Sequence, residues 1–224
     1  MLKKKPTGRI IHNNRFLSSC PRPMKRKNLR LDEKRSEKIL GIGKSAARLF
    51  NEKGYLETSM DEISNASGLS KGGVYHYFPS KNDILYFILM NYMGLILKNL
   101  EKDLKRIEGS FEKLQFVISR HIELFTKNVP ESKILLHEAY FLPTKYLRTV
   151  AEKERKYFRL IADVLSGLLG RRVSTGQLTV ITFTLLGMCN WIYSWYNPEG
   201  PITPKELSDI ISSIFFKGIS AYQE

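Results

Sequence analysis

The sequence predicts an all-helical protein, and three observations support this prediction. From residue 31 onward, apolar residues recur at spacings of three and four, which is the period of one face of an α-helix. Glycine, proline and serine separate the periodic segments at positions where helices begin and end. The chain has 224 residues, of which 42% are hydrophobic, so it can bury a core without disulfides or bound metal. Its length is typical of one or two domains.

The net charge is the most unusual property of the composition. Lys and Arg number 36 against 22 Asp and Glu, a formal net charge of +14. Residues 1–31 hold ten of the basic side chains and no acidic one, which leaves 26 basic and 22 acidic residues in 32–224. Such an excess indicates a polyanionic partner, either nucleic acid or an acidic membrane surface. The basic segment predicts a disordered extension, an arm that reaches DNA, or a leader ahead of a start at Met24.

The first predicted helix ends near Gly54, a residue suited to the left-handed conformation that follows a helix. Its apolar face comprises Ile39, Ile42, Ala46, Leu49 and Phe50. A short helix should follow, because Ser59 and Glu62 have the spacing of a capping box, in which each side chain bonds the other residue's backbone N–H. Gly68 is expected to end this short helix.

A second short helix is predicted to follow Ser70, whose side chain can cap its free N–H groups. It can run for only about two turns, because Pro79 biases the residue before it away from helical angles. Val74 and Phe78 are its expected core residues, and a long, strongly apolar helix should begin after Ser80. Two short helices joined by a tight glycine-containing turn, packed on a longer first helix, form a helix-turn-helix.

The N-terminal end of the second short helix has the chemistry of a DNA-reading element. Its free backbone N–H groups and positive dipole end attract phosphate. Two glycines permit close approach to a groove, a lysine can reach a guanine edge or a phosphate, and aromatic side chains offer ring faces and polar tips. These candidates are Lys71, Gly72, Gly73, Tyr75, His76 and Tyr77, with Lys81 expected beside the DNA backbone.

The run 68–85, GLSKGGVYHYFPSKNDIL, closely resembles the DNA-binding signature of TetR-family transcriptional regulators, and residues 46–63 resemble the segment that precedes it. The resemblance implies an all-α, two-domain homodimer of about nine helices. Such a dimer would bind a palindromic operator in double-stranded DNA and an effector in its C-terminal domain. The implied domains are a basic, disordered extension (1–31), a three-helix helix-turn-helix domain (32–82) and an effector-binding and dimerisation domain (83–224).

The same resemblance assigns roles within the DNA-binding domain by position. Lys71 and Tyr75 would read base edges. Contacts to the DNA backbone are implied for Thr58, Ser70, His76, Tyr77 and Lys81. Ser59, Gly72 and Gly73 complete the expected DNA-binding surface.

Further helices are predicted over 111–129, 131–141, 144–169, 174–197 and 203–222. Residues 173–198 are 26 consecutive residues without a charged side chain, long enough to cross a bilayer. The segment also contains many threonine, serine and asparagine residues, which suit a helix buried against a partner subunit better than one facing lipid. We therefore expect a dimer interface here, with membrane insertion as the alternative.

The run 186–200 places Trp191 and Trp195 on one helix face, with Asn190 beside them. It resembles the C-terminal domain of the TetR branch that responds to acyl-CoA thioesters, and residues 207–218 fit that branch too. This resemblance implies an apolar slot for an acyl chain and basic side chains for the phosphates of coenzyme A. The ligand-binding candidates are Met188, Asn190, Trp191, Trp195, Arg106 and Arg148. Further basic candidates are Lys98, Lys105, Arg155, Lys156 and Arg159. Alternatively, the two tryptophans pack in a dimer interface, and the basic residues lie on solvated helix faces.

Neither catalysis nor metal binding is predicted. Gly43, Lys44 and Ser45 match the end of a phosphate-binding loop, but the first glycine of that motif would fall at Lys38 and no strand precedes it. The four histidines do not pair at helical spacing, and the two cysteines are far apart in the sequence. The expectation is a protein with no catalytic residue, no metal and no cofactor besides its effector. Few cysteines and no signal-like apolar segment favour the cytoplasm.

The sequence thus predicts a cytoplasmic, homodimeric transcriptional repressor that an acyl-CoA effector releases from its operator, controlling genes of fatty-acid or lipid metabolism. Three alternatives remain open. The first is a TetR-type repressor of an efflux or other pathway that responds to a different apolar ligand. The second is a basic protein that compacts DNA without sequence preference. The third is a membrane-associated protein with residues 173–198 inserted.

Overall fold

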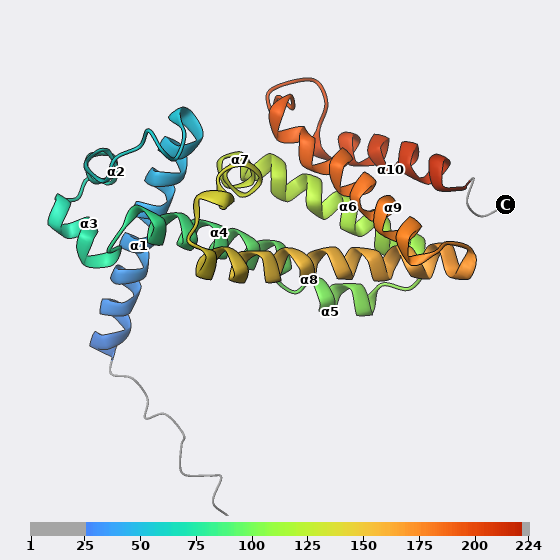
Figure 1. Ribbon diagram of the computed structural model, residues 1–224, viewed down its shortest axis with the longest axis horizontal. Helices are drawn as coiled ribbons and strands as arrows, with labels where there is room; N and C mark the ends of the chain where they lie inside the picture. The colour runs from blue at the N-terminus through green and yellow to red at the C-terminus, as the bar shows by residue number, and fades with distance from the viewer. Residues whose placement is uncertain (1–25, 221–224) are drawn as a thin grey trace, which may run out of the picture. The chain divides into compact units, whose positions relative to one another are not determined.

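The computed structural model describes residues 26–220, in which every regular element is a helix and no strand occurs (Figure 1). The all-α prediction is confirmed over these residues. By its internal contacts the chain divides into two units, residues 1–38 and 39–224. The basic extension before residue 26, together with Cys20, lies outside the described residues. The domain boundaries expected at residues 31 and 82 stay predictions.

Helix α1 (Arg26–Lys53) begins in the first unit and ends in the second. In the second unit its predicted apolar face is confirmed, because Ile42, Ala46 and Phe50 are buried. The helix ends where the sequence predicts, since Gly54 adopts a left-handed φ of 95° that an L-residue with a side chain rarely takes.

Helices α2 (Met60–Ser67) and α3 (Lys71–Tyr77) form the predicted helix-turn-helix. The capping box at the start of α2 is present, with the Ser59 Oγ accepting from the Glu62 N–H and the Glu62 carboxylate accepting from the Ser59 N–H. Gly68 ends α2 with a left-handed φ of 68°. Local hydrogen bonds between residues three apart therefore set the limits of both helices.

The long apolar helix after Ser80 is shorter than its hydrophobic pattern suggests. Helix α4 (Lys81–Leu97) stops before Asn99, whose φ of 58° breaks the helix, and a separate helix α5 (Leu100–Arg106) follows. The Arg120 guanidinium ends α4 by donating from Nη2 to the carbonyls of Leu95 (3.3 Å), Ile96 (3.4 Å) and Lys98 (2.7 Å). This extra break contributes to the ten α-helices among the described residues, where the resemblance implied about nine.

The remaining α-helices agree with the predicted ranges to within a few residues, except near residue 190. They are α6 (Ser110–Lys127), α7 (Val129–His137), α8 (Thr144–Leu169), α9 (Thr175–Asn190) and α10 (Pro204–Ser220). Three short 3-10 segments are η1 (Ala139–Phe141), η2 (Gly170–Arg172) and η3 (Trp191–Ser194). Helix α8 packs against α4, α6 and α9, and α10 packs along α6 (Figure 1).

Two apolar segments bear on the membrane alternative. Among the described residues, 81–106 is the segment long and apolar enough to span a bilayer, and its apolar side chains include Leu85, Leu89 and Met93, which are buried in the protein core. The uncharged segment 173–198 does not meet that criterion, and its α-helical part, α9, has 16 residues. Helix α4 is therefore a central helix of the protein core.

Candidate nucleic-acid interface and ligand cavity

Helix α3 presents one face to solvent and anchors itself with the other. Val74 is fully buried, whereas Lys71, His76 and Tyr75 (42% exposed) are at the surface. The Ser70 Oγ caps the helix by accepting from the Gly73 N–H at 3.1 Å. The predicted base-reading residues are therefore both accessible. His76 and the half-buried Tyr77 contact each other edge to face, with ring centroids 5.0 Å apart.

Lys71 is held by an acidic residue of the preceding helix. Its Nζ lies 2.8 Å from the Asp61 carboxylate, and this ion pair raises the pKa of Lys71. Both side chains are more than half exposed, so the pair is weak and exchangeable. Lys71 is thus a charged, oriented group that can leave Asp61 for a stronger anion.

The two glycines of α3 have different environments. A Cβ added at Gly72 would meet no atom within 4 Å, so nothing inside the protein requires a glycine there. At Gly73 an added Cβ would lie 3.2 Å from the capping Ser70 Oγ, which explains that glycine by local packing. The absence of a side chain at Gly72 therefore keeps the exposed face of α3 flat, and no contact within the protein explains this glycine.

Two predicted DNA-backbone contacts have internal roles. Thr58 is buried, and its hydroxyl donates to the Gly54 carbonyl at 2.8 Å. Lys81 donates from Nζ to the carbonyls of Tyr55 (2.7 Å), Leu56 (3.1 Å) and Thr58 (2.8 Å). These bonds use all three donors of the ammonium group, so none is left for a phosphate. Ser59 is at the surface, but its side chain is engaged in the capping box.

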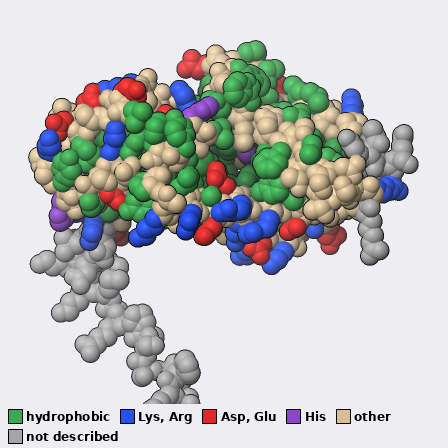
Figure 2. Space-filling model, in the orientation of Figure 1, with side chains coloured by type: hydrophobic (Ala, Val, Ile, Leu, Met, Phe, Trp, Pro, Cys, Tyr) green, Lys and Arg blue, Asp and Glu red, His purple; other side chains and the backbone are tan. Residues whose placement is uncertain are grey.

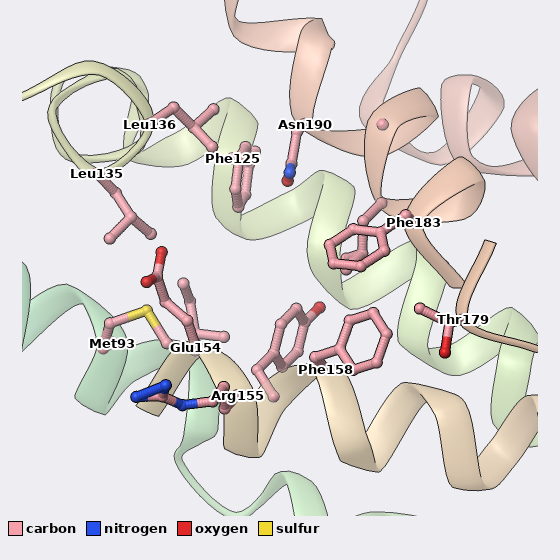
Figure 3. A pocket seen from close by; sticks show the side chains of 14 residues that line it. Met93, Phe125, Leu135, Leu136, Glu154, Arg155, Phe158, Thr179, Phe183 and Asn190 are labelled. Atoms are coloured by element: carbon pink, nitrogen blue, oxygen red, sulfur yellow. The ribbon is translucent and has the colours of Figure 1, made fainter. Parts of the chain in front are cut away.

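A cavity of about 600 Å³ lies among α4, α6, α7, α8 and α9 (Figure 3). Its lining comprises Met93, Ile96, Phe125, Leu135, Leu136, Glu154, Arg155, Tyr157, Phe158, Thr179, Phe183, Leu186, Gly187 and Asn190. Met93, Ile96, Phe125 and Leu135 are buried and form its floor. Glu154, Arg155 and Phe183 are exposed and mark its rim. The volume and the apolar lining suit a small apolar ligand.

Few polar groups interrupt this lining. The Thr179 hydroxyl is already used, because it donates to the Thr175 carbonyl at 2.9 Å. The Glu154 carboxylate is directed toward the side of the cavity where Leu135 and Met93 lie (Figure 3). Although the residue as a whole is exposed, these surroundings partly desolvate its carboxyl group, which raises the pKa of Glu154, while Arg155 acts in the opposite direction.

A buried polar group that the sequence analysis did not select lies behind the cavity wall. His121 of α6 stacks on Phe125 with centroids 4.0 Å apart, and its Nδ1 is 2.8 Å from the Tyr157 hydroxyl. Burial lowers the pKa of His121 to about 3, so the ring is neutral. The signal that could have found it is its position in an otherwise apolar stripe that includes Ile118 and Ile122.

Of the six predicted ligand residues, Asn190 lines the cavity and five do not. Met188 is half-buried against the core, whereas Trp191 (61% exposed) and Trp195 (57% exposed) face solvent. The helix prediction over 174–197 was wrong beyond Asn190, because the chain continues there as the 3-10 segment η3, and neither tryptophan lines the cavity.

The two predicted arginines also lie elsewhere. Arg148 is exposed outside the cavity lining. Arg106 borders a separate hollow with Lys102, Lys105 and Lys156. Lys156 and the cavity residue Phe158 are two positions apart on α8, which places them on opposite sides of that helix. Arg155, one of the further basic candidates, is the basic side chain that lines the cavity among the described residues.

An exposed apolar surface covers α9, η3 and α10. Its members with at least 47% exposure are Val180, Phe183, Trp191, Trp195, Ile210 and Ile214. Figure 2 shows hydrophobic side chains gathered over η3 and the segment that leads into α10. Exposed apolar side chains gathered in this way indicate an interaction site.

Two family models match the chain. Residues 42–86 match the model described as bacterial regulatory proteins, tetR family. Residues 108–219, half of the chain, match the tetracyclin repressor-like C-terminal domain. The first match contains α2, α3 and the start of α4, and the second contains every helix that lines the cavity except α4.

Known proteins of similar sequence are transcriptional regulators. The fatty acid metabolism regulator protein of Bacillus subtilis is 26% identical over 145 residues, which are 63% of this chain and 71% of that protein. The HTH-type transcriptional repressor KstR2 of Mycobacterium tuberculosis is 21% identical over 178 residues, 78% of this chain and 89% of that protein.

Solved structures share the fold over most of the chain. A TetR-family transcriptional regulator from Bordetella parapertussis has a TM-score of 0.77 and 25% identity, covering 82% of this chain and 96% of its own. The structure of AibR in complex with isovaleryl coenzyme A and operator DNA has a TM-score of 0.70 and 28% identity, covering 79% of this chain and 97% of its own.

Proposed function

The chain belongs to the TetR family of bacterial regulatory proteins, and from this premise we propose that it is a cytoplasmic, homodimeric repressor released from a palindromic operator by an acyl-CoA effector. As a member of the family it is a DNA-binding transcriptional regulator and not an enzyme. The genes under its control would belong to fatty-acid or lipid metabolism, as the name of the Bacillus relative suggests. The observation that carries the proposal concerns helix α8, which lines the apolar cavity and also bonds, through Tyr146, to the first turn of α4 directly after the helix-turn-helix.

DNA recognition is assigned to α3, which we call the recognition helix. Its exposed face would enter the major groove, with Gly72 permitting close approach. Lys71 would exchange Asp61 for a guanine edge or a phosphate, and Tyr75 would contact bases beside it. The exchange costs little, because the Lys71–Asp61 pair is exposed.

Dimerisation is assigned to the exposed apolar surface of α9, η3 and α10. Ile210 and Ile214 lie four residues apart on α10 and are 47% and 58% exposed, which is unusual for isoleucine in a monomer. A second copy of the chain would bury this surface and place two recognition helices at a fixed separation. A two-fold symmetric pair of recognition helices requires a palindromic site.

The effector site is assigned to the cavity. Its apolar floor suits an acyl chain, and Arg155 at the rim can pair with a phosphate of coenzyme A. The complex of AibR with isovaleryl coenzyme A supports this ligand class for a protein of the same fold. Release from DNA requires that the effector bind one conformation of the protein more tightly than the other.

The test is the fluorescence anisotropy of a DNA fragment from upstream of this protein's own gene, with excess competitor DNA. We expect tight binding that a long-chain acyl-CoA releases and that free coenzyme A and free fatty acid leave intact. Tight binding that is indifferent to acyl-CoA would retain the regulator and reject this effector. Binding that competitor DNA abolishes would favour the sequence-independent DNA-compacting alternative.

One observation favours a second candidate effector. The Glu154 carboxylate borders the cavity, and no basic group except Arg155 lines it among the described residues. A cationic amphiphile would place its positive charge against this carboxylate, as expected of a repressor of an efflux pathway. Thermal-shift measurements with cationic dyes, in the wild type and in Glu154→Gln, distinguish this ligand class from acyl-CoA esters.

A further inference from the structure

We propose that the effector carries an oxygen atom on its apolar part, a carbonyl or a hydroxyl, and that Asn190 and Tyr157 bind this atom with His121 behind them. The proposal rests on the assignment of the cavity as an acyl-CoA site and narrows the class of acyl group. A purely saturated acyl chain would offer Asn190 and the Tyr157 hydroxyl no hydrogen-bonding partner in the ligand.

Three helices bring these groups together. Tyr157 comes from α8 and Asn190 from the last residue of α9, and both line the cavity. His121 comes from α6 and is 3% exposed, so it reaches the cavity only through its neighbours. The remainder of the wall around them is largely aliphatic and aromatic. A polar cluster in such surroundings is costly unless every donor and acceptor is matched.

The hydrogen bonds within the protein do not satisfy every polar atom of this cluster. A neutral imidazole has one donor and one acceptor nitrogen, and Nδ1 of His121 is paired with the Tyr157 hydroxyl. The Asn190 side chain lies near enough to act on the ring, but Nε2 has no hydrogen bond of regular geometry within the protein. Native proteins rarely leave a buried polar atom in this state.

A ligand oxygen in the cavity would let Asn190 and Tyr157 complete the hydrogen bonding of this cluster. If Nδ1 donates to Tyr157, the Tyr157 hydroxyl can in turn donate to a ligand oxygen in the cavity. In this tautomer Nε2 is an acceptor, so the Asn190 NH₂ group can donate one hydrogen to Nε2 and the other to the same ligand oxygen. In the opposite tautomer the Tyr157 hydroxyl donates to Nδ1, and its oxygen can accept from a ligand hydroxyl. A methylene group can take none of these bonds.

The test compares acyl-CoA esters of one chain length on the purified full chain by isothermal titration calorimetry. The probes are dodecanoyl-CoA and its 3-oxo, 3-hydroxy and 12-hydroxy counterparts. We expect at least one oxygenated ester to bind about tenfold more tightly than dodecanoyl-CoA, as one good hydrogen bond provides. In Asn190→Leu the oxygenated esters and dodecanoyl-CoA should bind with nearly equal affinity, and dodecanoyl-CoA should still bind.

The matched control is Thr179→Val. Thr179 also lines the cavity, but its hydroxyl already bonds the Thr175 carbonyl, so the preference should persist. Equal affinities for all four esters in the wild type would overturn the proposal, and so would an Asn190→Leu variant that weakens all of them by one factor. Failure of every ester to bind would instead reject the acyl-CoA assignment itself, and this inference with it.

Discussion

The Tyr146 hydroxyl donates a hydrogen bond of 2.7 Å to Oδ1 of Asp83. The bond joins the first turn of α8 to the first turn of α4, directly after the helix-turn-helix. The Tyr146 ring also stacks on Tyr86, with centroids 4.2 Å apart, and the other oxygen of Asp83 accepts from the Ser80 hydroxyl at 2.6 Å. Because α8 lines the cavity further along, one helix contacts both the cavity and the first turn of the helix that follows the helix-turn-helix.

Tyr146→Phe is expected to weaken the coupling between effector and operator. The substitution removes the bond to Asp83 and keeps the ring stacked on Tyr86. We expect a stability loss of about 1–2 kcal/mol. The effect of acyl-CoA on operator affinity should fall by about 0.5–2 kcal/mol. Anisotropy titrations with and without acyl-CoA measure the second quantity, and Tyr140→Phe at an exposed tyrosine is the control. Equal coupling in wild type and variant would exclude this route.

Lys81→Met is expected to reduce stability without changing the number of phosphate contacts. The substitution removes three hydrogen bonds to the segment between α1 and α2, which costs about 1–3 kcal/mol in urea unfolding. The dependence of operator affinity on salt should keep its slope, because the lysine donors do not reach DNA.

Lys71→Ala provides the contrasting result at the surface. The stability of the variant protein should differ from that of the wild type by less than about 0.5 kcal/mol, because the ion pair between Lys71 and Asp61 is exposed. Specific binding should weaken by about 1–3 kcal/mol. If Lys81→Met had normal stability but a smaller dependence of operator affinity on salt, Lys81 would be a DNA-backbone contact after all.

Gly72→Ala separates folding from DNA binding. The added methyl group meets no protein atom and alanine favours helix, so stability should rise by up to about 1 kcal/mol. Operator affinity should fall about tenfold or more, because the methyl group would contact the groove. Thermal unfolding and anisotropy measure the two effects on one sample. Unchanged operator affinity would show that this face does not approach DNA closely.

Ile214→Asp is expected to dissociate the proposed dimer. The side chain is 58% exposed on α10, so the variant monomer should fold, while a charge in an apolar interface opposes association. Sedimentation velocity should show a monomer, and operator affinity should fall because the two half-sites are no longer bound together. Leu56→Asp, at a position 60% exposed in the segment before α2, should remain dimeric. A dimeric Ile214→Asp would place the interface elsewhere.

His121 should make stability fall in acid. Burial lowers its pKa from 6.5 to about 3, so between these values the unfolded chain takes up a proton and the folded chain does not. Stability attributable to this group is therefore complete above about pH 6.5 and decreases as the pH falls, by at most about 1.4 kcal/mol per unit. His121→Phe keeps the ring on Phe125 and should show a flatter profile in urea unfolding. Identical profiles would place His121 in contact with water.

Features set by neighbouring residues could be predicted from the sequence. The capping box of Ser59 and Glu62, the left-handed Gly68 and the cap at Ser70 depend on atoms three or four residues apart, and the structure has all of them. The exposure of Lys71 and Tyr75 follows from the same local pattern, because Val74 between them has to be buried. The all-helical class follows from apolar periodicity along the whole chain.

Features that depend on contacts between residues far apart in the sequence are determined by the tertiary structure alone. Lys81 bonds carbonyls 23 to 26 residues earlier, and Arg120 ends α4 from α6, and neither partner is visible in a local pattern. The two tryptophans share a face only if α9 continues, yet the α-helix ends at Asn190, a 3-10 segment follows, and both side chains are exposed. The cavity and the His121 cluster arise from helices that meet only in the folded chain, because a helix face specifies that it will be buried but not against which partner.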